Sequence, residues 1–296
     1  MAMRPMRRVM AGLLGLGLWA VLAVAAQPTN TGLSSFIRYQ SEGQNEGRVD
    51  TAVKTYTRAD GVKVTLFAAL HVADRGYYEA MQQRFKDCDA LLYEMVRDGG
   101  VEMTAEVGTD NPLSQLQIGM KRMLGLEFQL EAIDYSQRNF VHADLDPDTF
   151  FRLQEERGES ILGLMLQAIL AEQARQANNP QGTVSGLQLL MAFFSSDRAH
   201  ALKLLLGQQM ESMESMLAGI DQGKDGQGSV LVQGRNEHAL KVLGDEIKRG
   251  RRKLGIFYGA GHMPDFERRL EALGFKKTDE EWLTAWDIRR KRPATE

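Results

Sequence analysis

The order of apolar and polar residues along the chain predicts alternating strands and helices. Two strand-like runs flank Ala59–Gly61, where an Asp-Gly pair permits the positive φ angles of a tight hairpin turn. The second run, Val62 to Leu70, is almost wholly apolar, so we expect a central strand buried on both faces. Apolar residues recur at helical spacing from Asp74 to Asp87, and a second buried strand follows at Ala90 to Met95. This order predicts a right-handed crossover between parallel strands.

One long interruption separates this region from a similar pattern near the C-terminus. Asp148 to Ile220 has helical periodicity, no strand pattern and many of the 15 methionines, so we expect a helical insertion at about residues 148–225. Its Leu and Met stripes should pack on one another; the alternative is a Met-rich groove that accepts an apolar ligand. The other expected elements are helices at Pro112–Met123, Val230–Arg249 and Pro264–Leu273, and strands at Asn139–His142, Lys253–Tyr258 and Glu280–Ile288. These elements predict an α/β fold with a mixed, largely parallel sheet, flanking helices and a helical insertion.

The first 26 residues have the pattern of an export signal. Arg4, Arg7 and Arg8 precede an apolar stretch from Val9 to Ala26 that ends in small residues, which is the arrangement of a signal peptide. Because this stretch reaches the roughly 18 residues at which a spanning helix forms, the alternative is an uncleaved N-terminal anchor. Either interpretation predicts an exported protein, periplasmic or secreted, that touches a membrane only through this segment.

Composition narrows the class of protein further. Residues 27–47 are polar and rich in Ser, Gly, Asn and Gln, which predicts a flexible leader before one α/β domain at residues 48–296. The chain is 43% hydrophobic, enough for one large core. Removal of residues 1–25 changes the net charge from −3 to −6, which disfavours a nucleic-acid partner. Cys88 is the single cysteine, so core burial rather than an internal disulfide must supply the stability.

Four of the predicted strands end on groups that can titrate or bind a metal. These groups are His71, Glu94, His142 with Asp144, and His262. Ligands of such sheets bind where parallel strands end at their carboxyl edge, so we expect these side chains to converge there. The alternative is that each is a hydrogen-bonded structural residue. Gly259 and Gly261 are expected to let the backbone turn sharply and bring the imidazole of His262 close to the shared centre without a side-chain clash.

This set of groups points to hydrolytic chemistry. Two neutral imidazoles and a carboxylate form a site for a divalent metal cation with a water left for attack. The same groups also suit a site without metal, in which one histidine is the general base. The histidines lack the short helical spacing of zinc motifs, so Zn, Mn and Co all remain open.

Arg235 is a further candidate. It shares a helical face with Ala239 and Val242, so it points toward the core, where a guanidinium is costly to bury unless it meets an anion. Its functional interpretation is a clamp for Glu94 or for a substrate oxyanion. The alternative is a structural ion pair beneath the sheet.

These motifs, taken in order, resemble the TraB/GumN family, which is grouped with the Tiki metalloproteases and, more distantly, with the erythromycin-esterase and ChaN-like proteins. The late family motif is intact as Gly259–His262, followed by "RLEALGF". The early motif is "AALH", in which Ala68 stands where the family has glycine and His71 closes the motif. Arg235-Asn236 matches the Arg-Asn pair of the family, and Glu94 matches its glutamate at a strand end.

The resemblance implies an α/β core with a helical insertion and a metal-dependent, peptidase-like hydrolase with His71, Glu94 and His262 as ligands. Many members have no known substrate, so a peptide and an ester both remain open. Arg235 would stabilise a developing oxyanion, and His142, Asp144 and Asn236 are additional site candidates. A second hypothesis, suggested by the ChaN-like resemblance, is a protein that holds haem or another apolar ligand at the same edge. A third is a metal-independent esterase with His71 as base.

Overall fold

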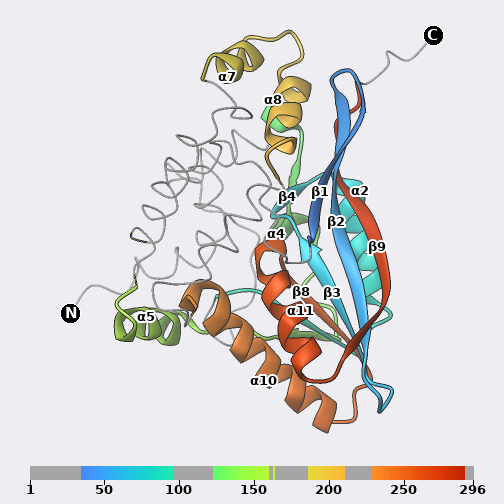
Figure 1. The fold of residues 1–296 in the computed structure, drawn as a ribbon, viewed down its shortest axis with the longest axis vertical. Helices are drawn as coiled ribbons and strands as arrows, with labels where there is room; N and C mark the ends of the chain where they lie inside the picture. Colours follow the sequence, from blue (N-terminus) through green and yellow to red (C-terminus); the bar gives the residue numbers. More distant parts are fainter. Residues whose placement is uncertain (1–34, 97–122, 160–162, 164–185, 211–227, 291–296) are drawn as a thin grey trace.

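The computed structural model describes residues 35–96, 123–159, 163, 186–210 and 228–290 (Figure 1). Several expected features lie outside these ranges and are not tested by the fold. They are the signal peptide or anchor at 1–26, the start of the leader, almost all of the helix at Pro112–Met123, much of the helical insertion, and the C-terminal tail from residue 291.

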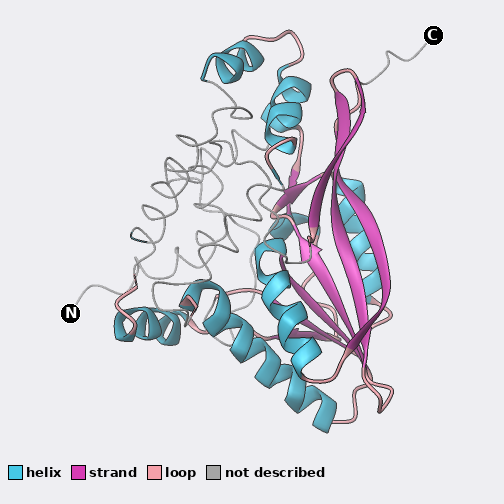
Figure 2. Cartoon of the chain, viewed as in Figure 1, coloured by secondary structure: helices cyan, strands magenta, loops and turns pink. Residues whose placement is uncertain are grey.

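A seven-stranded mixed sheet with flanking helices forms the centre of the protein and confirms the predicted α/β fold class (Figure 2). The strands are β1 (Ile37–Gly43), β2 (Glu46–Thr57), β3 (Lys63–Ala69), β5 (Ala90–Tyr93), β7 (Phe140–His142), β8 (Lys253–Gly259) and β9 (Lys276–Asp287). β3, β8, β5 and β7 lie side by side in that order, and all four are parallel. β2 pairs antiparallel with β1, β3 and β9, so within this sheet β2 alone runs in the opposite direction.

The hairpin predicted from the Asp-Gly pair joins β2 to β3. Gly61 has φ +83°, a conformation that costs glycine little because it has no Cβ. The predicted strands at 90–95 and 139–142 are also confirmed as β5 and β7. β8 lies between β3 and β5 in the sheet. The segment that connects β3 to β5 therefore leaves a gap one strand wide, and the C-terminal region fills it.

The flexible leader expected at 27–47 is wrong for its last part, because β1 occupies Ile37–Gly43 and β2 begins at Glu46. Phe36 and Ile37 are buried and fix the start of β1 in the core, whereas its last three residues are exposed. The turn to β2 uses a positive φ at Asn45. An outer strand in which only the first residue is buried has the polar composition of a loop, which is why composition alone misassigned it.

Helices cover both faces of the sheet (Figure 1). α2 (Arg75–Phe85) packs on one face through its buried residues Tyr77, Tyr78, Met81 and Phe85, as the helical spacing predicted. α10 (Arg235–Lys248) and α11 (Met263–Ala272) lie on the other face, and both confirm predicted helices. A π-helical turn at Val230–Gly234 precedes α10, and a 3-10 turn at Ala260–His262 precedes α11. The short elements are β4 (Val72–Ala73), β6 (Glu127–Phe128) and α4 (Gln129–Ala132).

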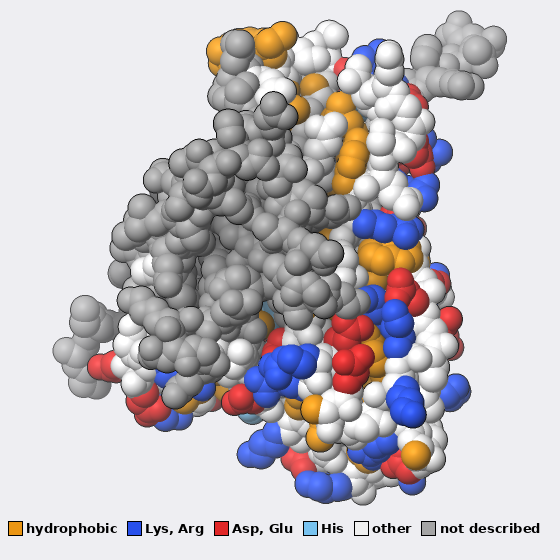
Figure 3. Space-filling view, viewed as in Figure 1, with side chains coloured by type: hydrophobic (Ala, Val, Ile, Leu, Met, Phe, Trp, Pro, Cys, Tyr) orange, Lys and Arg blue, Asp and Glu red, His pale blue; other side chains and the backbone are white. Residues whose placement is uncertain are grey.

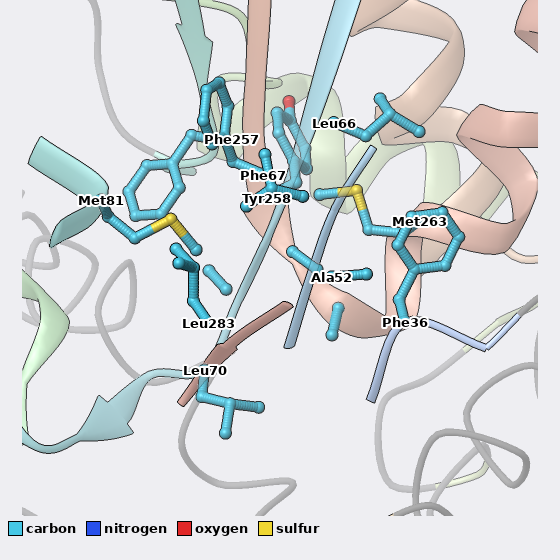
Figure 4. Packing of buried hydrophobic residues seen from close by; sticks show 14 of the residues in the cluster. Phe36, Ala52, Leu66, Phe67, Leu70, Met81, Phe257, Tyr258, Met263 and Leu283 are labelled. Atoms are coloured by element: carbon cyan, nitrogen blue, oxygen red, sulfur yellow. The ribbon is translucent and has the colours of Figure 1, made fainter. Parts of the chain in front are cut away.

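Alternate residues of the central strands fill the two layers of the core. On the α2 side the ring of Phe85 lies 5.1 Å from that of Phe67 and 4.7 Å from that of Phe257. On the α11 side the ring of Tyr258 packs edge-on to Phe266 at 5.1 Å. Figure 4 shows Met81 beside Phe257 on one side of the strands, and Met263 on the other side. Burial on both faces explains why these strands read as continuous apolar runs.

The described parts of the insertion are helical: α5 (Pro147–Glu156), α7 (Gly186–Phe193) and α8 (Arg198–Gly207). Lys203 of α8 donates to Asp74, at the N-terminus of α2, over 2.8 Å. Within the described ranges, no helix combines the length and apolar character needed to cross a bilayer. Lys and Arg side chains alternate with Asp and Glu on the visible part of the surface (Figure 3).

Candidate functional site

Three predicted site residues meet at the carboxyl edge of the parallel strands. His71 follows β3, Glu94 follows β5, and His262 ends the 3-10 turn after β8. Because β8 lies between β3 and β5, its last residue, Gly259, is placed between the other two strand ends. The shared direction of these strands therefore brings together residues that are far apart in the sequence.

Gly259 leaves room for all three groups. A Cβ at this position would lie 3.3 Å from Oε2 of Glu94, 3.6 Å from Nε2 of His71 and 3.9 Å from Cδ2 of His262. The backbone N–H of Gly259 also donates to Oε2 of Glu94 over 2.7 Å. The expected turn is present as the 3-10 turn at Ala260–His262, and neither Gly259, with φ −52°, nor Gly261 needs a positive φ to make it. The missing side chain at 259 leaves room chiefly for the Glu94 carboxylate, because only that contact would be tighter than ordinary van der Waals distance.

Arg235 lies between two carboxylates. Its Nε and Nη2 donate to the two oxygens of Asp144 over 2.9 and 2.5 Å, and Nη2 also donates to Oε1 of Glu94 over 2.7 Å. The side chains of Arg235, Asp144 and Glu94 are 6%, 0% and 10% exposed. The helical face predicted for Arg235 is confirmed, with Ala239 also buried. Glu94 is thus a partner of Arg235, and Asp144 is a second partner.

His262 is held on both ring nitrogens. Nδ1 lies 2.7 Å from Oδ1 of Asn236, the residue beside Arg235 in α10. Nε2 lies 3.4 Å from Nη1 of Arg235 and 3.7 Å from Oε1 of Glu94. The ring of Tyr258 packs edge-on against the imidazole at 5.3 Å. Asn236 therefore belongs to the site as a direct partner of His262.

Burial and charge set the protonation of these groups at neutral pH. Burial lowers the pKa of His71, and it lowers the pKa of His262 to about 4. Burial alone would raise the pKa of Glu94, but Arg235 and then the two histidines outweigh it and hold that pKa below its usual range. Burial would also lower the pKa of Arg235, yet the carboxylates of Asp144 and Glu94 raise it. The site therefore has neutral imidazoles, and its two carboxylates and one guanidinium leave one net negative charge.

The side chain of His142 contacts Met95 and Tyr93 rather than the group formed by His71, Glu94 and His262. Its Nε2 lies 2.6 Å from the carbonyl oxygen of Met95, and its ring packs against Tyr93 with centroids 5.7 Å apart. These contacts join the end of β7 to the end of β5. The structure thus separates the two additional candidates of this segment, since Asp144 binds Arg235 and His142 holds the backbone after Glu94.

Two residues at the site were missed by sequence reasoning. Gln129 is 5% exposed; its backbone N–H donates to the carbonyl oxygen of His71 over 2.9 Å, and its side chain donates to Tyr135. It reaches His71 because β6 pairs with β4, and no local pattern reveals that pairing. Asp265 accepts from Asn236 over 2.9 Å. Its position three residues after His262, in the first turn of α11, resembles an ordinary acidic helix start.

Ala68 stands where the resembled family carries glycine, and its environment explains why alanine is tolerated. The residue lies inside β3, is fully buried and does not have a positive φ. No left-handed conformation is therefore required of it, and His71 still reaches the strand edge.

The donor set fits a divalent cation chemically, because two neutral imidazoles and an ionised carboxylate are metal ligands. Among the described residues, however, no three or more His, Cys, Asp or Glu side chains are already arranged as a metal centre. Arg235 contacts both Oε1 of Glu94 and Nε2 of His262. Joint coordination by these atoms therefore requires the guanidinium to withdraw from Nε2.

Comparison with known proteins yields no matching family model, no matching curated protein and no matching solved structure.

Proposed function

We propose that this protein is an exported metal-dependent hydrolase of the TraB/GumN type, acting on a peptide or ester substrate at the carboxyl edge of β3, β8 and β5. The observation that carries the proposal is the position of Gly259, around which His71, Glu94 and His262 all approach. A buried and a partly buried imidazole, both kept neutral, lie here beside an ionised carboxylate, and perturbed groups gathered at one point are typical of a functional site. In this proposal the three side chains are the metal ligands.

The charge of the site supports a cation as the bound group. Glu94 and Asp144 carry two negative charges against the one positive charge of Arg235. The remaining negative charge of these side chains would favour binding of a divalent cation. When bound, the ion supplies a Lewis acid that lowers the pKa of a coordinated water.

Arg235 has a separate role in this proposal. Asp144 accepts from Nε and Nη2 of Arg235 and so fixes the orientation of the guanidinium. Nη1, the remaining nitrogen, faces His262. Nη1 makes the longest contact, 3.4 Å to His262 Nε2, and is the donor most easily transferred to a substrate oxygen. Such a fixed N–H group stabilises negative charge that develops on that oxygen.

Metal uptake tests the proposal directly. Elemental analysis of the exported protein and melting curves with Zn²⁺, Mn²⁺ and Co²⁺ should show one bound ion and a rise in Tm of about 5–10 °C at 100 times the Kd. His262→Ala should remove both effects while the protein stays folded. His200→Ala is the matched control, because His200 lies in α8 outside this site. If none of the three metals binds and chelators leave hydrolysis of a peptide and ester panel unchanged, the metal-dependent form of the proposal is wrong.

A metal-independent hydrolase is the second candidate, and the contact between Arg235 and His262 favours it. The guanidinium already lies against Glu94 and His262, as a resident cation would. His71, kept neutral by burial, would then be the general base. The distinguishing result is hydrolysis that persists in strong chelator and is lost in His71→Gln.

A further inference from the structure

Beyond the three proposed ligands, a hydrogen-bonded chain leads from His262 to a carboxylate on α11. His262 Nδ1 lies 2.7 Å from Oδ1 of Asn236, and Nδ2 of Asn236 lies 2.9 Å from Oδ2 of Asp265. Asn236 is fully buried, and Asp265 is 6% exposed. The proposed function uses Nε2 of His262 but gives no role to the hydrogen bonds that connect Nδ1, through Asn236, to Asp265.

The contacts of Asn236 fix which end of its amide faces the imidazole. Its NH₂ group donates both to the carbonyl oxygen of His262, over 3.1 Å, and to the carboxylate of Asp265. The reverse orientation would place the amide oxygen against a carbonyl oxygen and a carboxylate, with no donor between them. Oδ1 of Asn236 must therefore face Nδ1 of His262, so Nδ1 carries the proton.

Asp265 is itself held from the outer side. Its Oδ2 accepts from Nε of Arg269 over 2.6 Å, and its Oδ1 accepts from Arg268. The carboxylate also lies in the first turn of α11, where the helix dipole favours negative charge. Its orientation therefore does not depend on what binds in the site.

We infer that Asp265 is a positioning residue: through the Asn236 amide it keeps neutral His262 as the Nδ1–H tautomer and so directs the Nε2 lone pair toward Glu94. In the other tautomer the Nε2–H would face the N–H group of Arg235 Nη1, 3.4 Å away, as well as Oε1 of Glu94 at 3.7 Å, and no lone pair would be offered to a metal or a proton. Outer partners of this kind set both the tautomer and the orientation of a ligating imidazole. The inference rests on the proposed function only for the use made of that lone pair.

The first test observes the tautomer without metal or substrate. In full-length protein with ¹⁵N-labelled histidine and excess chelator at neutral pH, the His262 signals are assigned by their absence in His262→Gln. The wild type should show the Nδ1–H tautomer alone. Asp265→Leu should show a mixture, because the amide of Asn236 is then held against reversal only by its 3.1 Å bond to the carbonyl oxygen of His262. Asp265→Asn, which retains an acceptor oxygen, should restore the wild-type spectrum.

Arg269→Met is the matched control, because it removes a partner of Asp265 but leaves the carboxylate beside Asn236. It should keep the wild-type tautomer. A pure Nδ1–H tautomer in folded Asp265→Leu would overturn the inference. An Nε2–H tautomer in the wild type would overturn it without any variant, so the test stands even if Asp265→Leu does not fold.

Zinc affinity provides a second, separate readout. If the metal-dependent function holds, Asp265→Leu should bind Zn²⁺ about 10- to 100-fold more weakly than Arg269→Met, as is usual for loss of an outer partner of a ligating histidine. Absence of zinc binding by the wild type would count against the proposed function. The tautomer spectrum would still decide the role of Asp265.

Discussion

Replacing Arg235 with methionine tests whether this residue neutralises two buried carboxylates. Methionine is unbranched and uncharged, so the change removes the guanidinium and keeps a side chain in place of the aliphatic part of arginine. In the native protein the guanidinium makes three hydrogen bonds to carboxylates, two to Asp144 and one to Glu94, and a longer one to His262. After the substitution both carboxylates remain where water reaches them poorly, at 0% and 10% exposure.

The expected loss of stability is large at neutral pH. Removing one partner of a buried ion pair costs about 3–5 kcal/mol, because the other charge is left uncompensated. The loss should shrink in acid. Without Arg235 the main effect on Glu94 is burial, which raises its pKa, so the carboxyl takes up a proton in the folded variant more readily than in the unfolded chain. Protonation removes the buried charge, and the difference between variant and wild type should therefore narrow as the pH falls from 7 toward 5.

Urea unfolding of wild type and Arg235→Met at several pH values measures this difference. Arg75→Met is the control, because Arg75 forms an exposed pair with Glu79 at 78% and 66% exposure. Such a pair contributes about 0–1 kcal/mol, with little dependence on pH in this range. A loss for Arg235→Met at pH 7 no larger than that of Arg75→Met, or one that grows in acid, would refute the argument.

Two further predictions concern the space and the protonation of the site. Gly259→Ala should lower kcat/KM for hydrolysis by about tenfold or more, with a stability change of about 1 kcal/mol or less, because its Cβ would stand 3.3 Å from Glu94 Oε2 and the carboxylate must shift by a few tenths of an ångström. Gly244→Ala, whose Cβ would meet nothing within 4 Å in α10, should keep activity and gain about 0.4–1 kcal/mol in urea unfolding; equal activities of the two variants would contradict this use of Gly259. The His262 imidazole, with a pKa lowered by burial to about 4, should stay neutral in NMR titration down to about pH 5. Because the unfolded chain takes up that proton near pH 6.5, the stability supplied by neutral His262 should fall by about 3 kcal/mol between pH 6.5 and 4; a His262→Gln variant with an unchanged pH profile would disprove it.

The parts of the fold that the sequence predicts are those whose burial is uniform. β3, β5 and β8 are buried on both faces, so their apolar runs are visible without knowledge of neighbours. β1 is hidden in the sequence because only its first residue is buried and the rest are polar or partly exposed. The position of β8 between β3 and β5 is also hidden, because periodicity reports the environment of a strand and not the identity of its partners.

The residues of the site also fall into those that the sequence predicts and those that it does not. Polar groups at strand ends identify His71, Glu94 and His262, since a titratable residue that closes an apolar run stands out. The second carboxylate on Arg235 and the role of Asp265 depend on side chains that meet across three elements, which no local spacing encodes. Gly259 shows the same limit: the sequence predicts a glycine that avoids a side-chain clash, but only the packing shows that the group a side chain would crowd is the Glu94 carboxylate.

The place of β8 in the sheet has a consequence for biogenesis. β3 and β5 are made early, yet each keeps an open hydrogen-bonding edge until Lys253–Gly259 leaves the ribosome and fills the gap between them. A nascent chain shorter than that already carries His71 and Glu94 but has no strand to hold them at a common distance. Closure of the sheet is therefore a late, long-range event in folding. The unpaired edges of β3 and β5 are the surfaces to which a chaperone would bind before closure.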